Sequence, residues 1–233
     1  MGWQPAGSRD TLPSPKIRSR SIAADAAQRS LEKPRRQDAV RYIGTVVRLQ
    51  VQESSLKVGD KPRRYDPAPI RSVPALSVSP DGVVGFAENG ETILDVHHYD
   101  HPTSKNRGGE NGISLGFTRH YREMRQRFGQ HLADGIAGEN ILIEADRQFQ
   151  VEELAAGVVV EGTAGRRLEL RPVIVAAPCA EFSRYALKFP DDSRPDATVT
   201  EALRFLDAGM RGFYATYAGE PAVVEVGARV LVS

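Results

Sequence analysis

From residue 41 onward the chain is a succession of short apolar runs, rich in β-branched residues and separated by turn-forming residues. The first run, Tyr42–Val51, alternates apolar and polar positions from Val47 onward, which is the pattern of a half-buried strand. Comparable runs occupy residues 91–96, 140–144, 157–161, 167–177, 212–217, 222–226 and 229–232. Many short strands with Gly, Pro, Asn and Asp between them are typical of a barrel or sandwich rather than of a parallel sheet. The sequence therefore predicts a mainly β fold.

Two segments have the helical period instead. Thr118 is predicted to cap a helix over Arg119–Phe128, with a glycine after its last turn. The pattern Thr198–Glu201 is a capping box and predicts a second helix, which ends at Gly209. Residues 57–90 contain five prolines and predict no regular element. The expected domain is thus a set of strands with a few short helices.

Residues 1–40 differ from the rest of the chain. They carry eight basic and four acidic residues, a local charge of +4, together with four prolines and few large apolar side chains. Such a segment buries too little apolar surface to offset its ordering entropy. We therefore expect a disordered tail over residues 1–40 and one folded domain over residues 41–233.

The overall composition excludes several classes of protein. Thirty-one basic residues against thirty acidic ones argue against a general nucleic-acid binder. No apolar run approaches the roughly 20 residues that cross a bilayer. A single cysteine excludes a disulfide framework and fits a reducing compartment. The expectation is a cytoplasmic protein that binds neither membranes nor nucleic acid.

That cysteine, Cys179, follows the apolar run Val173–Ala177 and a proline. A thiol at the end of a strand is placed to face a pocket, and its thiolate binds soft metals and attacks sulfur. Free cysteine is also among the most buried residue types and often acts as a small hydrophobe. The residue alone leaves both interpretations open.

The densest group of chemically active side chains lies in residues 95–111, between a predicted strand and a predicted helix. His97, His98 and His101 offer imidazoles for metal binding or proton transfer, and Lys105 and Arg107 offer charge for an anion. Two adjacent glycines follow and allow backbone amides to approach a ligand. The spacing is not that of a zinc site, and the loop is equally compatible with a solvated polar segment. Ser104 lacks the surrounding motif of a hydrolase nucleophile.

Several motifs follow one another in a characteristic order. They are Gly44–Val47, Asp81–Gly85, the His-rich loop before a helix, Asp134–Ile141, Pro178-Cys179 and Gly209–Ala215, followed by a strand that ends at Gly227. From about Arg41 to the C-terminus this order resembles the MOSC domain, a β-rich module named for the C-terminal region of molybdenum-cofactor sulfurase.

The resemblance implies an antiparallel β-barrel in which Cys179 is the functional thiol and the metal ligand. In related proteins this cysteine coordinates the molybdenum of a pterin cofactor or is proposed to carry sulfur. The cofactor-binding residues that the resemblance implies are His97, His98, His101, Lys105, Arg107, Gly138, Glu139, Asn140 and Arg211. The family's usual acid is missing at Phe86 and at Ala228, which removes any role of those acids but leaves the thiol untouched.

Three functions follow from this resemblance. The first is a molybdenum-dependent oxidoreductase that acts on N-hydroxylated or related small substrates and needs an electron-transfer partner. The second is a sulfur carrier that holds a persulfide on Cys179 for a separate desulfurase, itself dependent on bound pyridoxal phosphate. The third is a noncatalytic binding barrel in which Cys179 is buried and inert. Substrate, electron donor and oligomeric state are not encoded in any motif of the sequence.

Overall fold

A computed structural model describes residues 40–106, 112–190 and 196–232. These residues belong to one compact unit of the chain, and the sheets dominate it, as the sequence predicts. The predicted tail of residues 1–40 lies outside the described residues except for Val40. No helix of the described part is long and apolar enough to cross a membrane.

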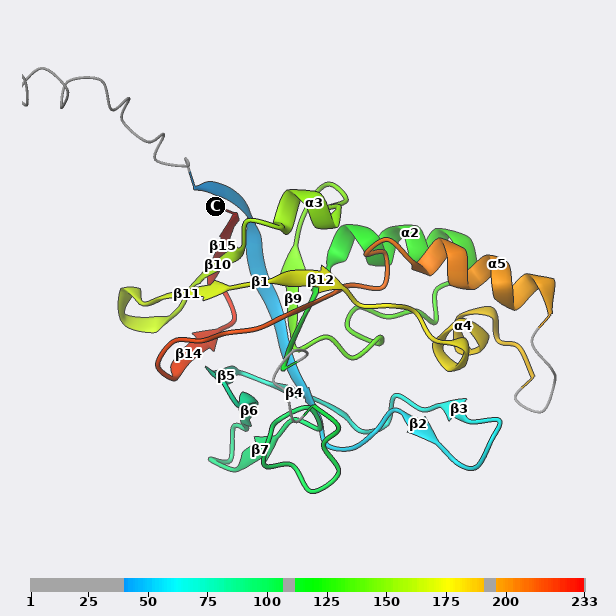
Figure 1. Cartoon of the computed structure of the whole chain (residues 1–233), viewed down its shortest axis with the longest axis horizontal. Coiled ribbons are helices and arrows are strands. Elements are labelled where there is room, and N and C mark those ends of the chain that lie inside the picture. The colour runs from blue at the N-terminus through cyan, green and yellow to red at the C-terminus, as the bar shows by residue number, and fades with distance from the viewer. Residues whose placement is uncertain (1–39, 107–111, 191–195, 233) are drawn as a thin grey trace, which may run out of the picture. The chain divides into compact units, whose positions relative to one another are not determined.

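The largest sheet of the described chain has nine strands, in the order β11-β10-β15-β1-β9-β8-β13-β12 with β4 paired to β1. Its strands are β1 (Arg41–Gln52), β4 (Ile70–Val73), β8 (Ile113–Phe117), β9 (Ile141–Glu144), β10 (Val158–Glu161), β11 (Arg167–Leu170), β12 (Val173–Val175), β13 (Phe213–Ala215) and β15 (Arg229–Val232). Figure 1 shows β1 running through the middle of the fold. This strand pairs with β15, β9 and β4 at successive positions, so three separate parts of the chain are assembled on it.

Two smaller sheets complete the β structure. One has the order β14-β5-β6-β7, and the other is the β2-β3 hairpin. Their bounds are β2 (Lys57–Val58), β3 (Arg64–Tyr65), β5 (Ala75–Ser79), β6 (Gly82–Phe86), β7 (Thr92–Leu94) and β14 (Ala222–Glu225). Residues 57–90, for which the sequence predicts no element, thus form the five strands β2 to β6 and the turns between them.

Pairing in these sheets is antiparallel except between β8 and β9, which are parallel. The connection between those two strands contains α2, so β8, α2 and β9 form a crossover of the kind that parallel strands require. The strand order of the nine-stranded sheet is an open path, and a closed barrel is not observed. The mainly β prediction is therefore confirmed, while the barrel stays a prediction.

Four α-helices and one short 3-10 turn lie in the described chain. They are α2 (Thr118–Phe128), α3 (Val151–Leu154), α4 (Ala180–Leu187), α5 (Ala197–Leu206) and η2 (Thr163–Gly165). Both predicted helices exist, but both predicted caps are wrong. Asp196 caps α5, since its side chain accepts from the Thr198 and Val199 amides. The Thr118 hydroxyl instead exchanges hydrogen bonds with the backbone of Ala145, and α2 has no side-chain cap.

The apolar interior is divided into two clusters. The larger one fills the space inside the sheets and includes Val46, Leu115 and Phe213. The smaller one lies under the helices and joins Tyr121 and Met124 of α2 with residues of α4, α5 and β3. Figure 1 shows α2, α4 and α5 gathered on one side of β1 and the β11 and β14 strands on the other. The smaller cluster therefore supports the start of α4, with Cys179 packed against it, whereas the end of β12 packs against the larger cluster.

Candidate functional site

A cavity of about 260 Å³ opens where several strands end. Its walls come from the end of β1, the β2-β3 hairpin, the loop after β7, the segment between β12 and α4, and the start of β13. It is lined by Gln52, Ser55, Leu56, Lys57, Arg63, Tyr65, Val96, His97, Thr103, Lys105, Ala177, Cys179, Arg211 and Tyr214. Residues that are far apart in the sequence therefore meet around Cys179.

Strand pairing places Cys179 beside Arg211. Strand β12 pairs with β13 up to Val175 opposite Phe213, and the Ala176 amide then donates to the Gly212 carbonyl at 3.0 Å. The chain turns away immediately afterwards, because Cys179 is the N-cap residue of α4. The Cys179 side chain is only partly buried, and it packs against the smaller apolar cluster while lining the cavity. Helix α4, which begins after Cys179, buries Phe182 and Ala186.

Arg211 forms the cationic wall beside the thiol. Its Nη2 donates to the Ala137 carbonyl at 3.2 Å, and its guanidinium lies 5.8 Å from the centroid of the Phe182 ring. Its Nε is buried and has no hydrogen-bond partner among the described residues. Burial acts to lower the pKa of Arg211, but the charges of Tyr214, Tyr65, Cys179 and Glu139 together raise it above the ordinary value. The guanidinium is therefore a fixed positive charge with unused donor capacity.

The remaining charged side chains of the cavity have the same sign. Lys57, Arg63 and Lys105 line it together with Arg211, and no Asp or Glu is among the lining residues of the described chain. Glu181 does not line the cavity but lies 3.8 Å from Lys57; burial acts to raise its pKa, whereas its own backbone amide, Lys57, Cys179 and Arg63 together lower it, so it balances part of this charge. An excess of cations around a partly closed space favours an anionic ligand, because the anion interacts favourably with their positive charge and accepts their hydrogen bonds. The cavity is an anion site by its charge.

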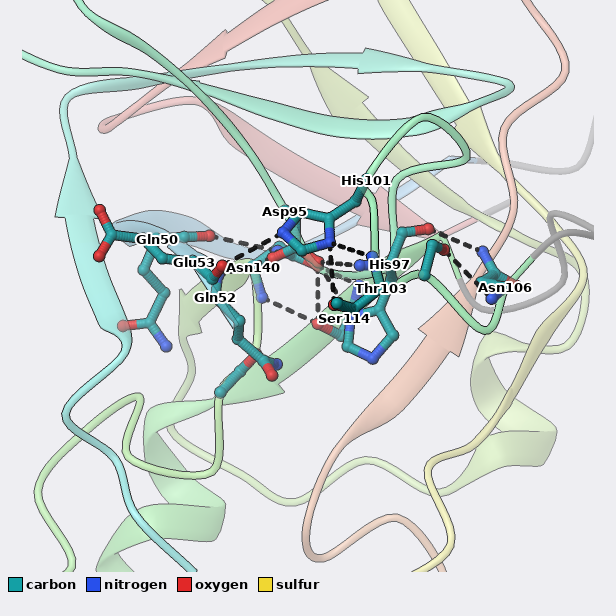
Figure 2. Close-up of polar contacts among 12 residues, drawn as sticks. Gln50, Gln52, Glu53, Asp95, His97, His101, Thr103, Asn106, Ser114 and Asn140 are labelled. Carbon is teal, nitrogen blue, oxygen red and sulfur yellow. Dashed lines mark hydrogen bonds and ion pairs between the residues drawn. The ribbon is translucent and has the colours of Figure 1, made fainter. Parts of the chain in front are cut away.

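His97 is the histidine that lines the cavity, and a buried carboxylate holds its ring. The His97 Nδ1 lies 2.9 Å from Asp95 Oδ1, which also accepts from the His97 amide at 2.9 Å. The Asp95 side chain has no exposed surface. Its second oxygen, Oδ2, accepts from the backbone amide of Gln52 and from Asn140 Nδ2, both at 2.8 Å. Figure 2 shows Asp95 at the centre of this network, between His97, Gln52 and Asn140.

Asn140 joins this network to the start of β9. Its Oδ1 accepts from the Ser114 amide at 3.0 Å and from the Ser114 hydroxyl at 2.8 Å, and its Nδ2 also donates to the Gln50 carbonyl at 3.2 Å. All four hydrogen-bonding positions of the amide are used, so Asn140 has none left for a ligand. The Asn140 side chain is buried and connects β1, β8 and Asp95, and its cofactor-binding role stays a prediction.

Glu139 lies behind the cavity in a small recess of about 10 Å³, which also involves Gln52, Gly138, Arg211 and Tyr214. Its Oε2 accepts from the Tyr121 hydroxyl at 2.7 Å, and its Oε1 is buried with no partner among the described residues. Burial raises the pKa of Glu139, although the Tyr121 hydrogen bond and the charge of Arg211 act to lower it. The recess has about the volume of one water molecule, and two unpartnered polar atoms line it.

The other predicted site residues occupy different places. His98 is buried, and its Nδ1 accepts from the Asp100 amide at 3.2 Å. His101 interacts with the Glu53 carbonyl at 3.2 Å and with Thr103, so it holds the loop against β1. Neither residue lines the cavity. Arg107 lies outside the described residues, and Gly138 lines the small recess.

Several residues around the cavity are not predicted from the sequence. Asp95 lies two positions before His97, and this spacing is the one feature of the sequence that could have indicated a carboxylate partner for the histidine. Tyr65 and Arg63 come from the hairpin in the proline-rich stretch, where no pattern predicted an element. The Tyr65 hydroxyl donates to the Ile136 carbonyl at 2.7 Å, and burial raises the pKa of Tyr65 despite the opposing charge of Arg211.

The described residues contain no group of three His, Cys, Asp or Glu side chains that could hold a metal ion. A metal at Cys179 would therefore have to arrive with ligands of its own.

No protein-family model and no curated protein matches the chain. Among solved structures, the YUAD protein from Bacillus subtilis aligns with 81% of this chain and 94% of its own, at 13% sequence identity and a TM-score of 0.50. A hypothetical protein aligns with 82% of this chain and 69% of its own, at 11% identity and a TM-score of 0.48. YiiM from Geobacillus stearothermophilus aligns with 83% of this chain and 75% of its own, at 15% identity and a TM-score of 0.39.

These similarities bear on the fold alone. The likeness to the YUAD protein shows a shared fold at an identity too low to carry function. The other two TM-scores are too low to support an argument.

Proposed function

We propose that this protein is a MOSC-type protein that binds a molybdenum–pterin cofactor through the thiolate of Cys179. One observation carries the proposal: the single thiol of the chain lines a cavity together with four cationic side chains and no carboxylate of the described chain. A thiolate is a preferred ligand of soft metals, and cations bind the phosphate of such a cofactor. The motif order of the sequence and the mainly β fold are consistent with this assignment.

The residues present fit such a group in chemistry and in part in size. Small-molecule sites usually enclose about 300–1,000 Å³, so a cavity of about 260 Å³ holds only part of a pterin cofactor. Cys179 would hold the metal of such a cofactor. Arg211, Arg63 and Lys105 would hold its anionic part.

When bound, the cofactor supplies oxygen-atom transfer, and N-hydroxylated compounds are the substrate class that we propose. The protein contributes a fixed thiolate, positive charge and one imidazole at the cavity wall. His97 is that imidazole, and Asp95 holds its ring from the buried side through the Nδ1 contact at 2.9 Å. An electron-transfer protein is the partner that this function requires.

The barrel of the MOSC family belongs to the same proposal. The two end strands of the nine-stranded sheet, β11 and β12, are consecutive in the chain and are separated only by Arg171 and Pro172. Thr216 follows β13 and holds this connection from both sides, since Arg171 donates to its carbonyl at 2.9 Å and the Thr216 hydroxyl donates back at 2.6 Å. The chain itself thus bridges the gap between the end strands.

Elemental analysis of the purified protein tests the cofactor assignment. Wild type should carry near-stoichiometric molybdenum, and Cys179→Ser should carry almost none. Two neighbouring arginines give a matched comparison: Arg63 lines the cavity, whereas Arg64 is exposed and pairs with Asp66 at 3.3 Å. Arg63→Gln should lower the molybdenum content and Arg64→Gln should not. A wild-type protein free of molybdenum after expression with ample cofactor would refute the proposal.

A sulfur carrier is the second candidate, and the cations beside Cys179 favour it as well, because they stabilise a persulfide anion. Its donor would be a separate pyridoxal-phosphate-dependent desulfurase. Intact mass would then show one added sulfur atom, lost on reduction and absent in Cys179→Ser. A protein with neither molybdenum nor persulfide, whose thiol alkylates only after unfolding, would instead be the noncatalytic binding barrel.

A further inference from the structure

We infer that Asp95 and Asn140 are positioning residues that keep His97 in the tautomer with its proton on Nδ1, so that Nε2 exchanges protons with an acidic group of the ligand in the Cys179 cavity. The role of the cavity rests on the proposed function, whereas the tautomer does not. Neither Asp95 nor the positioning role of Asn140 is part of the site expected from the sequence.

The ionisation of Asp95 follows from its four hydrogen bonds. Three of its partners can only donate: the amides of His97 and Gln52 and the Nδ2 group of Asn140. The orientation of the Asn140 amide is itself fixed, because its Oδ1 accepts from the Ser114 amide. Asp95 is therefore a carboxylate, and His97 Nδ1 is the fourth donor.

This arrangement determines which nitrogen faces the ligand. Nδ1 is held at 2.9 Å from Asp95, so Nε2 is the ring nitrogen left for a ligand, and the His97 side chain is 28% exposed and lines the cavity. The described residues provide no hydrogen bond to His97 Nε2, which is not among the buried unpartnered atoms. The neutral ring thus presents a lone pair to the cavity.

The proton transfer is balanced within the ring and the ligand. An N–H bond forms at Nε2 as the O–H bond of the ligand's acidic group breaks, and the electron pair stays on the ligand oxygen. The resulting imidazolium keeps its charge next to Asp95, and the anionic ligand faces Lys105 and Arg211. The reverse step returns the proton from Nε2 to the same ligand oxygen. No oxidant or reductant takes part in this transfer.

The other four histidines provide internal references, because their contacts also determine their tautomers. His98 and His101 each accept a backbone amide at Nδ1, and His131 Nε2 lies 3.1 Å from the Ala186 carbonyl, so these three carry the proton on Nε2. His120 accepts the Phe149 amide at Nε2 and therefore carries its proton on Nδ1, as His97 does. The chain contains five histidines in all, and each is described.

Nitrogen-15 NMR of histidine-labelled protein tests the inference at a pH where the rings are neutral. Wild-type His97 should show a protonated Nδ1 and a bare Nε2, the opposite of His98 and His101. Asp95→Asn should move the His97 proton to Nε2, since an amide group in that place can donate to Nδ1. The matched control is Asp100→Asn, the same change at an exposed residue of the same loop, which should alter no tautomer.

A wild-type spectrum with the His97 proton on Nε2 would overturn the inference, and so would an unchanged tautomer in a folded Asp95→Asn protein. The wild-type spectrum alone tests the inference if that variant does not fold.

Addition of an N-hydroxylated compound to wild type should shift the His97 nitrogen signals and leave those of His131 in place. Molybdenum content of the same samples tests the cofactor separately: protein without molybdenum but with Nδ1-protonated His97 refutes the proposed function only.

Discussion

Gly138 lies at a point where the backbone conformation and the available space both exclude a side chain. Its φ is +89°, and a Cβ added there would lie 2.7 Å from Gln52 Nε2 and 2.7 Å from Leu56 Cδ1. Gln52 also donates to the Gly138 carbonyl at 2.7 Å, so it cannot move aside without losing that hydrogen bond. Leu56 lines the Cys179 cavity, so a methyl group at residue 138 would displace the cavity wall.

The cost of Gly138→Ala has two parts. A left-handed backbone costs a residue with a Cβ about 1–2 kcal/mol, and forced overpacking costs about 1–3 kcal/mol more. The free energy of unfolding should therefore fall by about 2–5 kcal/mol. Gly90→Ala is the matched control, since Gly90 has φ +83° and no atom within 4 Å of the added Cβ. That variant should lose only the backbone part, about 1–2 kcal/mol.

Urea denaturation of the two variants and wild type measures the difference directly. Gly138→Ala should lose about 1–3 kcal/mol more free energy of unfolding than Gly90→Ala. In a domain of this size, each kcal/mol lowers the melting temperature by about 2–4 °C. Equal losses in Gly138→Ala and Gly90→Ala would refute the reasoning, because the steric contact with Gln52 and Leu56 would then contribute nothing.

Three further predictions concern stability. Burial lowers the pKa of His120 from 6.5 to about 4, so the unfolded chain binds a proton at this residue before the folded chain does as the pH falls. The free energy of unfolding should therefore drop by about 3 kcal/mol between pH 6.5 and 4. Urea titrations of His120→Gln should lack this part of the pH dependence. Asp196→Ala should cost about 0.5–2 kcal/mol through loss of the α5 cap, and Asp196→Asn, which keeps an acceptor, should cost less in the same assay. Cys179→Ser should change the free energy of unfolding by less than about 1 kcal/mol, because the thiol is only partly buried; a larger loss in thermal melts would return Cys179 to a structural role.

Strands were predictable where one face is buried and the other is not. The alternating run at Tyr42–Val51 became β1, and 222–226 and 229–232 became β14 and β15 with shifts of a residue or so. The run 167–177 was read as one strand, but Pro172 lacks the amide that a ladder needs, and the chain there forms β11 and β12 instead. Strand β8 is not among the predicted strands, although Ile113, Leu115 and Phe117 alternate with Ser114 and Gly116; that pattern predicts one buried face, whereas all five residues are buried.

The helix caps and α4 show what local patterns leave out. Thr118 has the right residue type for a cap, but tertiary contact with Ala145 at the end of β9 uses its hydroxyl. The short α4 follows a proline and carries its apolar residues over barely two turns, too few for a clear period. Its stability comes from packing of Phe182 and Ala186 against residues of other elements, which no local pattern encodes.

The site was predictable in part for a similar reason. His97, Lys105, Cys179 and Arg211 carry recognisable chemistry, and the structure places them around one cavity. Which histidine faces the cavity depends on Asp95, and the position of Asp95 depends on Gln52 and Asn140 from other strands. Choosing His97 over His98 or His101 therefore requires the pairing of β1 with β9, which is not visible in the loop itself.

The pairing of β1 with β15 has a consequence for how the chain reaches its fold during synthesis. Arg41–Thr45 hydrogen-bond to Arg229–Val232, so one edge of the earliest described strand has no partner until the latest one has left the ribosome. Contacts so far apart in sequence make folding slow, and an open strand edge invites pairing with other chains in the meantime. Strands β4 and β9 are synthesised earlier but pair with Leu49–Gln52 and Thr45–Leu49, so they leave the edge of β1 that faces β15 open until β15 is made.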